Sequence, residues 1–113
     1  MHEMSLVTSV LQLVENSAKV NGFSRVKTVW LEIGALAGVE AEAMRFCFDA
    51  VVKGTLADGA RLEIVATKGQ GQCLDCGGSV FIEARYDPCS LCGSYRVEPT
   101  GGMAMRVKEL EVE

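Results

Sequence analysis

The 113-residue chain has a single histidine, His2, so it has no Ser/His/Asp set of the kind that carries nucleophilic hydrolysis. It also lacks the Gly-x4-Gly-Lys-Ser/Thr motif that cradles nucleotide phosphates. No uncharged apolar run approaches the roughly 18 residues that a membrane-spanning helix requires. We therefore expect a protein that is not an enzyme and has no membrane span.

Signals for secretion and for nucleic-acid binding are missing as well. The opening Met1-His2-Glu3-Met4 has neither the basic region nor the small-residue cleavage site of a signal peptide, so we expect a cytoplasmic protein. The formal net charge is −4, and residues 68–100 carry three basic and four acidic side chains. Because binding to phosphate backbones needs a basic surface, we expect no nucleic-acid partner.

The strongest signal in the chain is a repeated cysteine spacing. Four of the five cysteines form two pairs, Cys73-x2-Cys76 and Cys89-x2-Cys92. Two such pairs can complete a tetrahedral, four-sulfur site for one structural Zn(II). Each pair is followed by a glycine, Gly77 or Gly93, which can adopt the positive φ that curls the backbone around a metal. Disulfides and a redox dithiol are the alternatives, but a cytoplasmic setting and the lack of a βαβ pattern disfavour them.

The periodicity of apolar residues predicts an α+β fold. Apolar residues recur at helical spacing over 4–20 and 40–53, and they alternate as in strands over 25–34, 60–67 and 103–112. We predict two helices packed on a small three-stranded sheet, formed by residues 1–68 and 101–113. A zinc-ribbon module, residues 69–100, is inserted between two strands of that sheet.

A second cluster of potential ligands opens the chain. The α-amine of Met1, the amide nitrogen of His2 and the His2 imidazole can close fused chelate rings around one ion, a nitrogen set that suits Ni(II) or Cu(II). The alternative is a frayed terminus with an incidental histidine. Glu3 and Glu40 are candidate oxygen ligands, or acidic residues favoured at the start of a helix. Cys47 lies in the apolar stripe of the second helix and is interpreted as a structural thiol.

Several separated segments resemble one known family along essentially the whole chain. They are Met1-His2-Glu3 leading into a helix, Val29-Trp30-Leu31-Glu32-Ile33-Gly34 with Gly38-Val39-Glu40, Arg45-Phe46-Cys47-Phe48, and the two Cys-x2-Cys pairs. In this combination the sequence is similar to the HypA/HybF family, nickel metallochaperones for the maturation of NiFe-hydrogenases.

The resemblance implies a function and partners that the residues alone do not give. It implies a Ni(II) site at His2 that uses main-chain nitrogens of Met1 and His2, with Glu3 matching the family motif as a ligand or a partner contact. Glu40 matches a following acidic position, and the four paired cysteines match the structural Zn(II) site. The implied partners are a nickel-binding maturation GTPase and the immature hydrogenase large subunit.

Several points stay open at this level. Some relatives carry histidines near the zinc cysteines, whereas this ribbon has none, so a histidine-driven pH response is not expected there. Monomer and homodimer are both compatible with the sequence, and so is a supply of nickel to urease. The competing function is a zinc-ribbon interaction or nucleic-acid adaptor in which the terminus binds no nickel.

Overall fold

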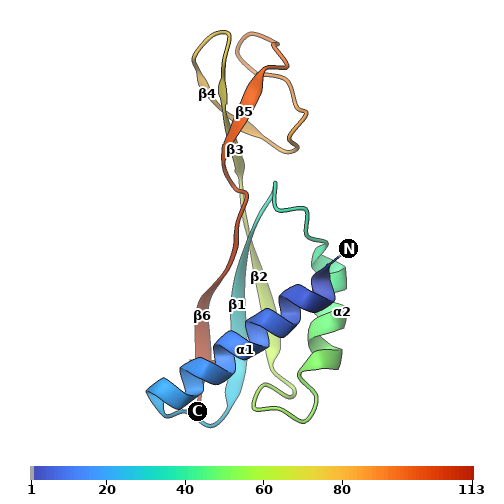
Figure 1. Ribbon diagram of the computed structural model, residues 1–113, viewed down its shortest axis with the longest axis vertical. Helices are drawn as coiled ribbons and strands as arrows, with labels where there is room; N and C mark the ends of the chain where they lie inside the picture. The colour runs from blue at the N-terminus through green and yellow to red at the C-terminus, as the bar shows by residue number, and fades with distance from the viewer. Residues whose placement is uncertain (1) are drawn as a thin grey trace. The chain divides into compact units, whose positions relative to one another are not determined.

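The computed structural model describes residues 2–113 and contains two helices and two three-stranded sheets (Figure 1). The elements follow the order α1 (Glu3–Asn21), β1 (Val26–Gly34), α2 (Ala41–Val51), β2 (Arg61–Thr67), β3 (Gly69–Cys73), β4 (Ser79–Ile82), β5 (Val97–Gly101) and β6 (Met105–Val112). The chain divides into two compact units. The first runs through Leu31 and adds Val39–Ile64 and Val107–Glu113, and the second comprises Glu32–Gly38 and Val65–Arg106.

Helix α1 forms because its apolar residues recur every three or four positions and make one buried stripe. Val7, Val10 and Val14 are buried on that stripe. The helix ends where Gly22 adopts a left-handed conformation, φ 77°, and donates its N–H to the Ala18 carbonyl at 2.8 Å. The helix predicted over 4–20 from its apolar spacing is confirmed.

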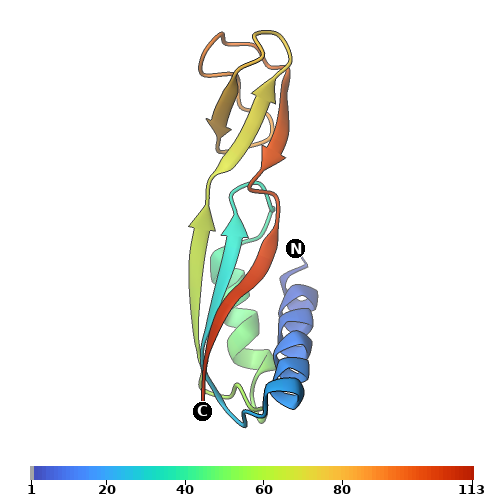
Figure 2. The same ribbon diagram turned by 90° about the vertical axis from the view of Figure 1, so that its left-hand side faces the viewer.

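The first sheet has the strand order β2-β1-β6, and both helices lie on the same side of it (Figures 1 and 2). Helix α2 contributes Met44 and Phe48 to the core of the first unit. Strand β1 contributes Val29 and Leu31, which are buried as its alternating pattern predicts. This unit is the predicted α+β layer of two helices on a three-stranded sheet.

The second sheet has the strand order β4-β3-β5, with β3 antiparallel to both neighbours. Its small core consists of Leu36, Cys73, Val80, Ile82, Cys89 and Val97. Strand β3 is Gly-rich because its neighbours approach closely: a Cβ on Gly71 would lie 2.5 Å from a methyl carbon of Val97. Two of the six core side chains are cysteines, so the metal-site residues are also part of the core.

The segment after β1 is held within the second unit by main-chain hydrogen bonds. Gly34 donates to the Ala104 carbonyl, Ala35 to the Thr67 carbonyl and Leu36 to the Gly102 carbonyl, at 2.8–2.9 Å. The expected ribbon, 69–100, therefore lies inside a larger unit that also includes 32–38. None of the helices described for residues 2–113 is both long and apolar enough to cross a membrane.

Candidate metal centre

The four paired cysteines lie on two tight loops of the second unit. The first cysteine loop, 73–77, follows β3, and its Gly77 has φ 74° and donates to the Cys73 carbonyl at 2.9 Å. The second cysteine loop, 89–93, repeats the arrangement: Gly93 has φ 78° and donates to the Cys89 carbonyl at 2.8 Å. The positive φ that the sequence predicts for both glycines is confirmed.

These loops bring the four sulfur atoms together. All four Sγ atoms lie within 4.8 Å of one another. Between the loops, Cys73 Sγ is 3.6 Å from Cys92 Sγ, and Cys76 Sγ is 3.8 Å from Cys89 Sγ. Four sulfurs at about 2.3 Å from one zinc ion are about 3.8 Å apart in a tetrahedron. The cluster therefore fits one Zn(II) with four thiolates.

Main-chain amides donate hydrogen bonds to the sulfurs of the two buried cysteines. The Cys76 amide donates to Cys73 Sγ, and the Leu91 amide donates to Cys89 Sγ, both at 3.4 Å. The Cys76 amide is the main cause that lowers the pKa of Cys73 to about 6. The Ser94 amide lowers the pKa of Cys92, but the neighbouring sulfurs, Cys73 first, and desolvation outweigh it and raise the value to about 12. Ionisation of one thiol thus raises the pKa of its neighbour. A bound dication would remove the repulsion between the two thiolates.

The alternative of a disulfide does not fit this geometry. The Cys73–Cys92 and Cys76–Cys89 sulfur pairs, at 3.6 and 3.8 Å, are far beyond the length of a disulfide bond, about 2.05 Å, and all five cysteines are free thiols. Cys73 and Cys89 are buried, with exposed fractions of 1% and 2%, while Cys76 and Cys92 are exposed. Cys47 lies half-buried on α2 in the first unit, as a structural thiol would.

A polar network that the sequence analysis did not identify joins the two cysteine loops. Asp75 sits within the first loop, and Ser94 and Arg96 follow the second. The Asp75 carboxylate accepts from the Ser94 hydroxyl and from Arg96 Nη1, the latter at 2.6 Å. No spacing signal could have revealed it, because the partners are 19 and 21 residues apart.

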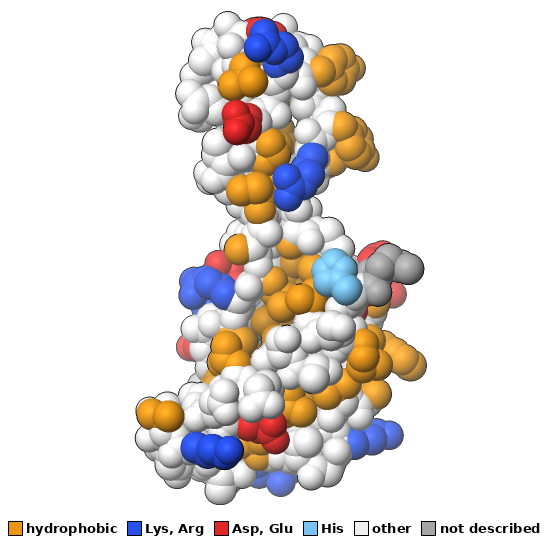
Figure 3. Space-filling model, in the orientation of Figure 1, with side chains coloured by type: hydrophobic (Ala, Val, Ile, Leu, Met, Phe, Trp, Pro, Cys, Tyr) orange, Lys and Arg blue, Asp and Glu red, His pale blue; other side chains and the backbone are white. Residues whose placement is uncertain are grey.

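The N-terminal candidates are brought together in part. His2 is exposed at the start of α1 (pale blue in Figure 3), and its carbonyl accepts from the Leu6 amide at 3.1 Å. Glu3 is buried, with 7% of its surface exposed, and its Oε2 accepts from the Glu40 amide at 3.2 Å. The Glu40 side chain is exposed. The predicted ligand atoms of Met1 lie outside the described residues.

The Glu3 carboxylate is strongly favoured in its charged form. The chain's α-amino group is the largest cause that lowers the pKa of Glu3 to about 2, and the Glu40 amide is the next. Because the Glu3 carboxylate accepts a hydrogen bond from the amide of Glu40, the residue before α2, it also supports the start of the second helix. This structural role of Glu3 was not predicted, because its partner is 37 residues away in the sequence.

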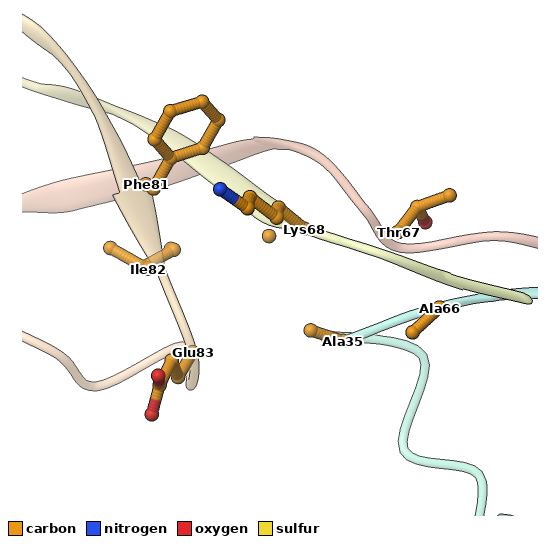
Figure 4. Close-up of a pocket in the computed structure, with 8 residues that line it drawn as sticks. Ala35, Ala66, Thr67, Lys68, Phe81, Ile82 and Glu83 are labelled. Carbon is orange, nitrogen blue, oxygen red and sulfur yellow. The ribbon is translucent and has the colours of Figure 1, made fainter.

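A hollow of about 700 Å³ on the second unit is a weaker candidate for binding. Lys68 lies along it with its ammonium 4.9 Å from the centre of the Phe81 ring, and Glu83 stands at the opposite side (Figure 4). The remaining lining is mainly small or aliphatic, including Ala35 and Ile82. A single carboxylate offers little for a metal, so this hollow does not compete with the cysteine cluster.

Comparison with known proteins identifies the family to which the chain belongs. Residues 1–112 match the family model described as "Hydrogenase/urease nickel incorporation, metallochaperone, hypA". Among curated proteins, the chain is 58% identical to the hydrogenase maturation factor HypA of Azotobacter chroococcum and 55% identical to that of Azotobacter vinelandii. Both alignments cover 113 residues, 100% of either chain.

Solved structures agree as well. The solution structure of the nickel metallochaperone HypA from Helicobacter pylori matches with a TM-score of 0.69 and 31% identity, over 99% of this chain and 97% of that one. A second HypA solution structure matches with a TM-score of 0.71 and 30% identity, over 100% and 97%. The resemblance drawn from the sequence is confirmed, and the chain belongs to the HypA family of nickel metallochaperones.

Proposed function

We propose that the chain binds Ni(II) at its N-terminus and delivers it to the immature large subunit of a NiFe-hydrogenase. The observation that carries this proposal is the exposed position of the only histidine, His2, immediately before α1 in a chain of the HypA family. An exposed imidazole beside main-chain nitrogens offers donors that Ni(II) prefers. It is also accessible to an acceptor's ligands.

The ligand set proposed for nickel is the His2 imidazole with the main-chain nitrogens of Met1 and His2, supplemented by an oxygen from Glu3 or Glu40. The contact between Glu3 and the Glu40 amide supports different roles for the two acids. Glu3 orders the start of α2 through the Glu40 amide, and Glu40 presents an exposed side chain. Nickel would be released by stepwise replacement of these ligands with the acceptor's cysteines.

The proposed zinc ligands are Cys73, Cys76, Cys89 and Cys92, and the ion's part is structural. Tetrahedral spacing between the sulfurs supports zinc over nickel at this site. The chain itself then has two metal sites with different donors, nitrogen at the terminus and sulfur in the second unit. This difference would keep the transported ion apart from the resident one.

The proposed partners are a maturation GTPase that supplies the nucleotide-driven step and the hydrogenase large subunit as the acceptor. The family description also names urease, so urease is a second acceptor class to test. The alternative of a nucleic-acid adaptor has no observation in its favour, since basic residues do not outnumber acidic ones in the ribbon.

Nickel titration of the purified protein tests the proposal. The wild type should bind one Ni(II) in addition to its zinc, and His2→Ala should abolish the tight nickel site while zinc content stays at one ion per chain. The control is Glu42→Gln, a change of one exposed acid in the first turn of α2. Full-strength nickel binding by His2→Ala would refute the proposed site.

A further inference from the structure

Three side chains outside the cysteine set connect the two cysteine loops, and together we name them the clamp: Asp75, Ser94 and Arg96. Asp75 lies between the two cysteines of the first loop, 73–77. Ser94 and Arg96 follow the second loop, 89–93. The clamp therefore bridges the two halves of the metal site without supplying a ligand.

The hydrogen bonds of the clamp are mutually supporting. Both carboxylate oxygens of Asp75 are used: Oδ1 accepts from Arg96 Nη1 at 2.6 Å, and Oδ2 accepts from the Ser94 hydroxyl. The same hydroxyl accepts from the Arg96 amide at 3.0 Å, which fixes its direction. A main-chain bond from the Leu74 amide to the Arg96 carbonyl, 2.8 Å, runs beside them. The carboxylate is thus held by two donors, of which the Ser94 hydroxyl is itself fixed by the Arg96 amide.

The clamp joins the two cysteine loops, and the distance between these loops determines how far apart the metal-site sulfurs lie. Two of the sulfur contacts, Cys73 with Cys92 and Cys76 with Cys89, join one loop to the other. Opening the loops would therefore pull these pairs apart. In a square-planar nickel site with bonds of similar length, opposite sulfurs would be about 4.6 Å apart and neighbouring ones about 3.3 Å. The observed 3.6 and 3.8 Å match the tetrahedral arrangement instead.

We propose that the clamp retains Zn(II) in the cysteine cluster when Ni(II) is abundant, and so determines which metal the second unit keeps. The proposal rests on the zinc ligand set of the proposed function. Exchange replaces one dication with another and leaves four thiolates, so charge balances without any other reactant. Exchange would begin at Cys76 or Cys92, the two exposed residues that would hold the ion. The clamp would keep these sulfurs near the site, so that zinc is retained.

The expected size of the effect is set by solvent exposure. The side chains of Arg96 and Asp75 are 67% and 41% exposed, so the ion pair alone is weak. The convergence of two charge-assisted bonds on one carboxylate adds to it. We expect loss of the clamp to speed zinc release by about 3- to 10-fold, in line with a modest charge-assisted contact.

The experiment uses the full-length, zinc-loaded protein with Asp75→Asn, Arg96→Gln and both changes together. Excess Ni(II) is added, aliquots are desalted at intervals, and zinc and nickel are measured by mass spectrometry. Nickel–thiolate charge-transfer absorption reports nickel entering the cysteines, because the terminal nitrogen site contains no sulfur. The matched control is Glu32→Gln, which breaks another carboxylate–arginine pair in the same unit, with Arg106 at 3.0 Å.

Asp75→Asn should lose zinc and gain the thiolate absorption faster, with unchanged helix signal, while Glu32→Gln matches the wild type. The double variant should be no faster than the faster single variant, because both remove one contact. Ser94→Ala, which deletes only a hydroxyl, should give a smaller increase in the rate of zinc release. This variant replaces Asp75→Asn in the experiment if Asp75→Asn does not load zinc. Equal zinc-release rates in all zinc-loaded proteins would refute the role of the clamp and leave the zinc ligand set in place. A wild type without zinc would overturn the ligand set and the clamp with it.

Discussion

Replacing Cys89 with alanine should unfold the second unit while leaving the first one folded. Cys89 is buried, and it is both a proposed zinc ligand and one of six residues in the small core of that unit. The four aliphatic members of this core are Leu36, Val80, Ile82 and Val97. Their burial contributes about 2 kcal/mol each, or about 8 kcal/mol together. Structural zinc contributes about 10–16 kcal/mol in zinc-finger peptides, so we expect the metal to be the larger contribution here.

The matched control is Cys47→Ala, which removes the fifth thiol from α2 in the first unit. Metal analysis should find one zinc ion in Cys47→Ala and none in Cys89→Ala. Amide resonances of 65–106 should collapse to unfolded positions in Cys89→Ala, while the helix signal at 222 nm is retained in both. A Cys89→Ala protein that keeps one zinc ion and dispersed resonances in 65–106 would refute the argument that metal and core form one unit.

Further predictions concern a buried acid and a close backbone contact. Because the pKa of Glu3 is lowered to about 2 in the folded protein, its charged form stabilises the fold above about pH 4.5, and that contribution is lost as pH falls toward 2. The stability difference between wild type and Glu3→Gln in urea should therefore shrink across this range, and a constant difference would contradict it. Gly34→Ala should destabilise the second unit by about 2–4 kcal/mol in chemical denaturation, since its Cβ would lie 2.1 Å from the Gly102 carbonyl oxygen. Gly38→Ala, in open space with φ +70°, should cost only about 1–2 kcal/mol, and equal losses would contradict the contact.

Local patterns predicted the elements of this fold well, because helices and strands depend on residues close in sequence. The helix predicted over 4–20 is observed as Glu3–Asn21, and the strand predicted over 60–67 as Arg61–Thr67. The second helix ends earlier than predicted, at Val51 rather than 53, since the chain turns toward Gly54 with φ 78°. The spacing of the cysteines predicted a four-sulfur cluster, because two residues between ligands fix the local loop.

Contacts between distant residues were not predictable from the same patterns. Leu36 contributes to the core of the second unit through a loop that follows β1, and nothing near it in sequence indicates this. The burial of Glu3 against the Glu40 amide was likewise missed, because an acid at a helix start usually faces solvent. Each of these depends on tertiary packing that brings segments more than 30 residues apart into contact.

The most direct test of nickel binding at the N-terminus is a calorimetric titration of the protein with two residues, Gly-Ser, added before Met1. The extension removes no side chain and leaves the cysteine cluster untouched, but it takes the α-amine away from His2. We predict that nickel affinity falls by about tenfold or more, at least about 1.4 kcal/mol, and approaches that of His2→Ala, while zinc content is unchanged. Undiminished nickel affinity in the extended protein would contradict the terminal site.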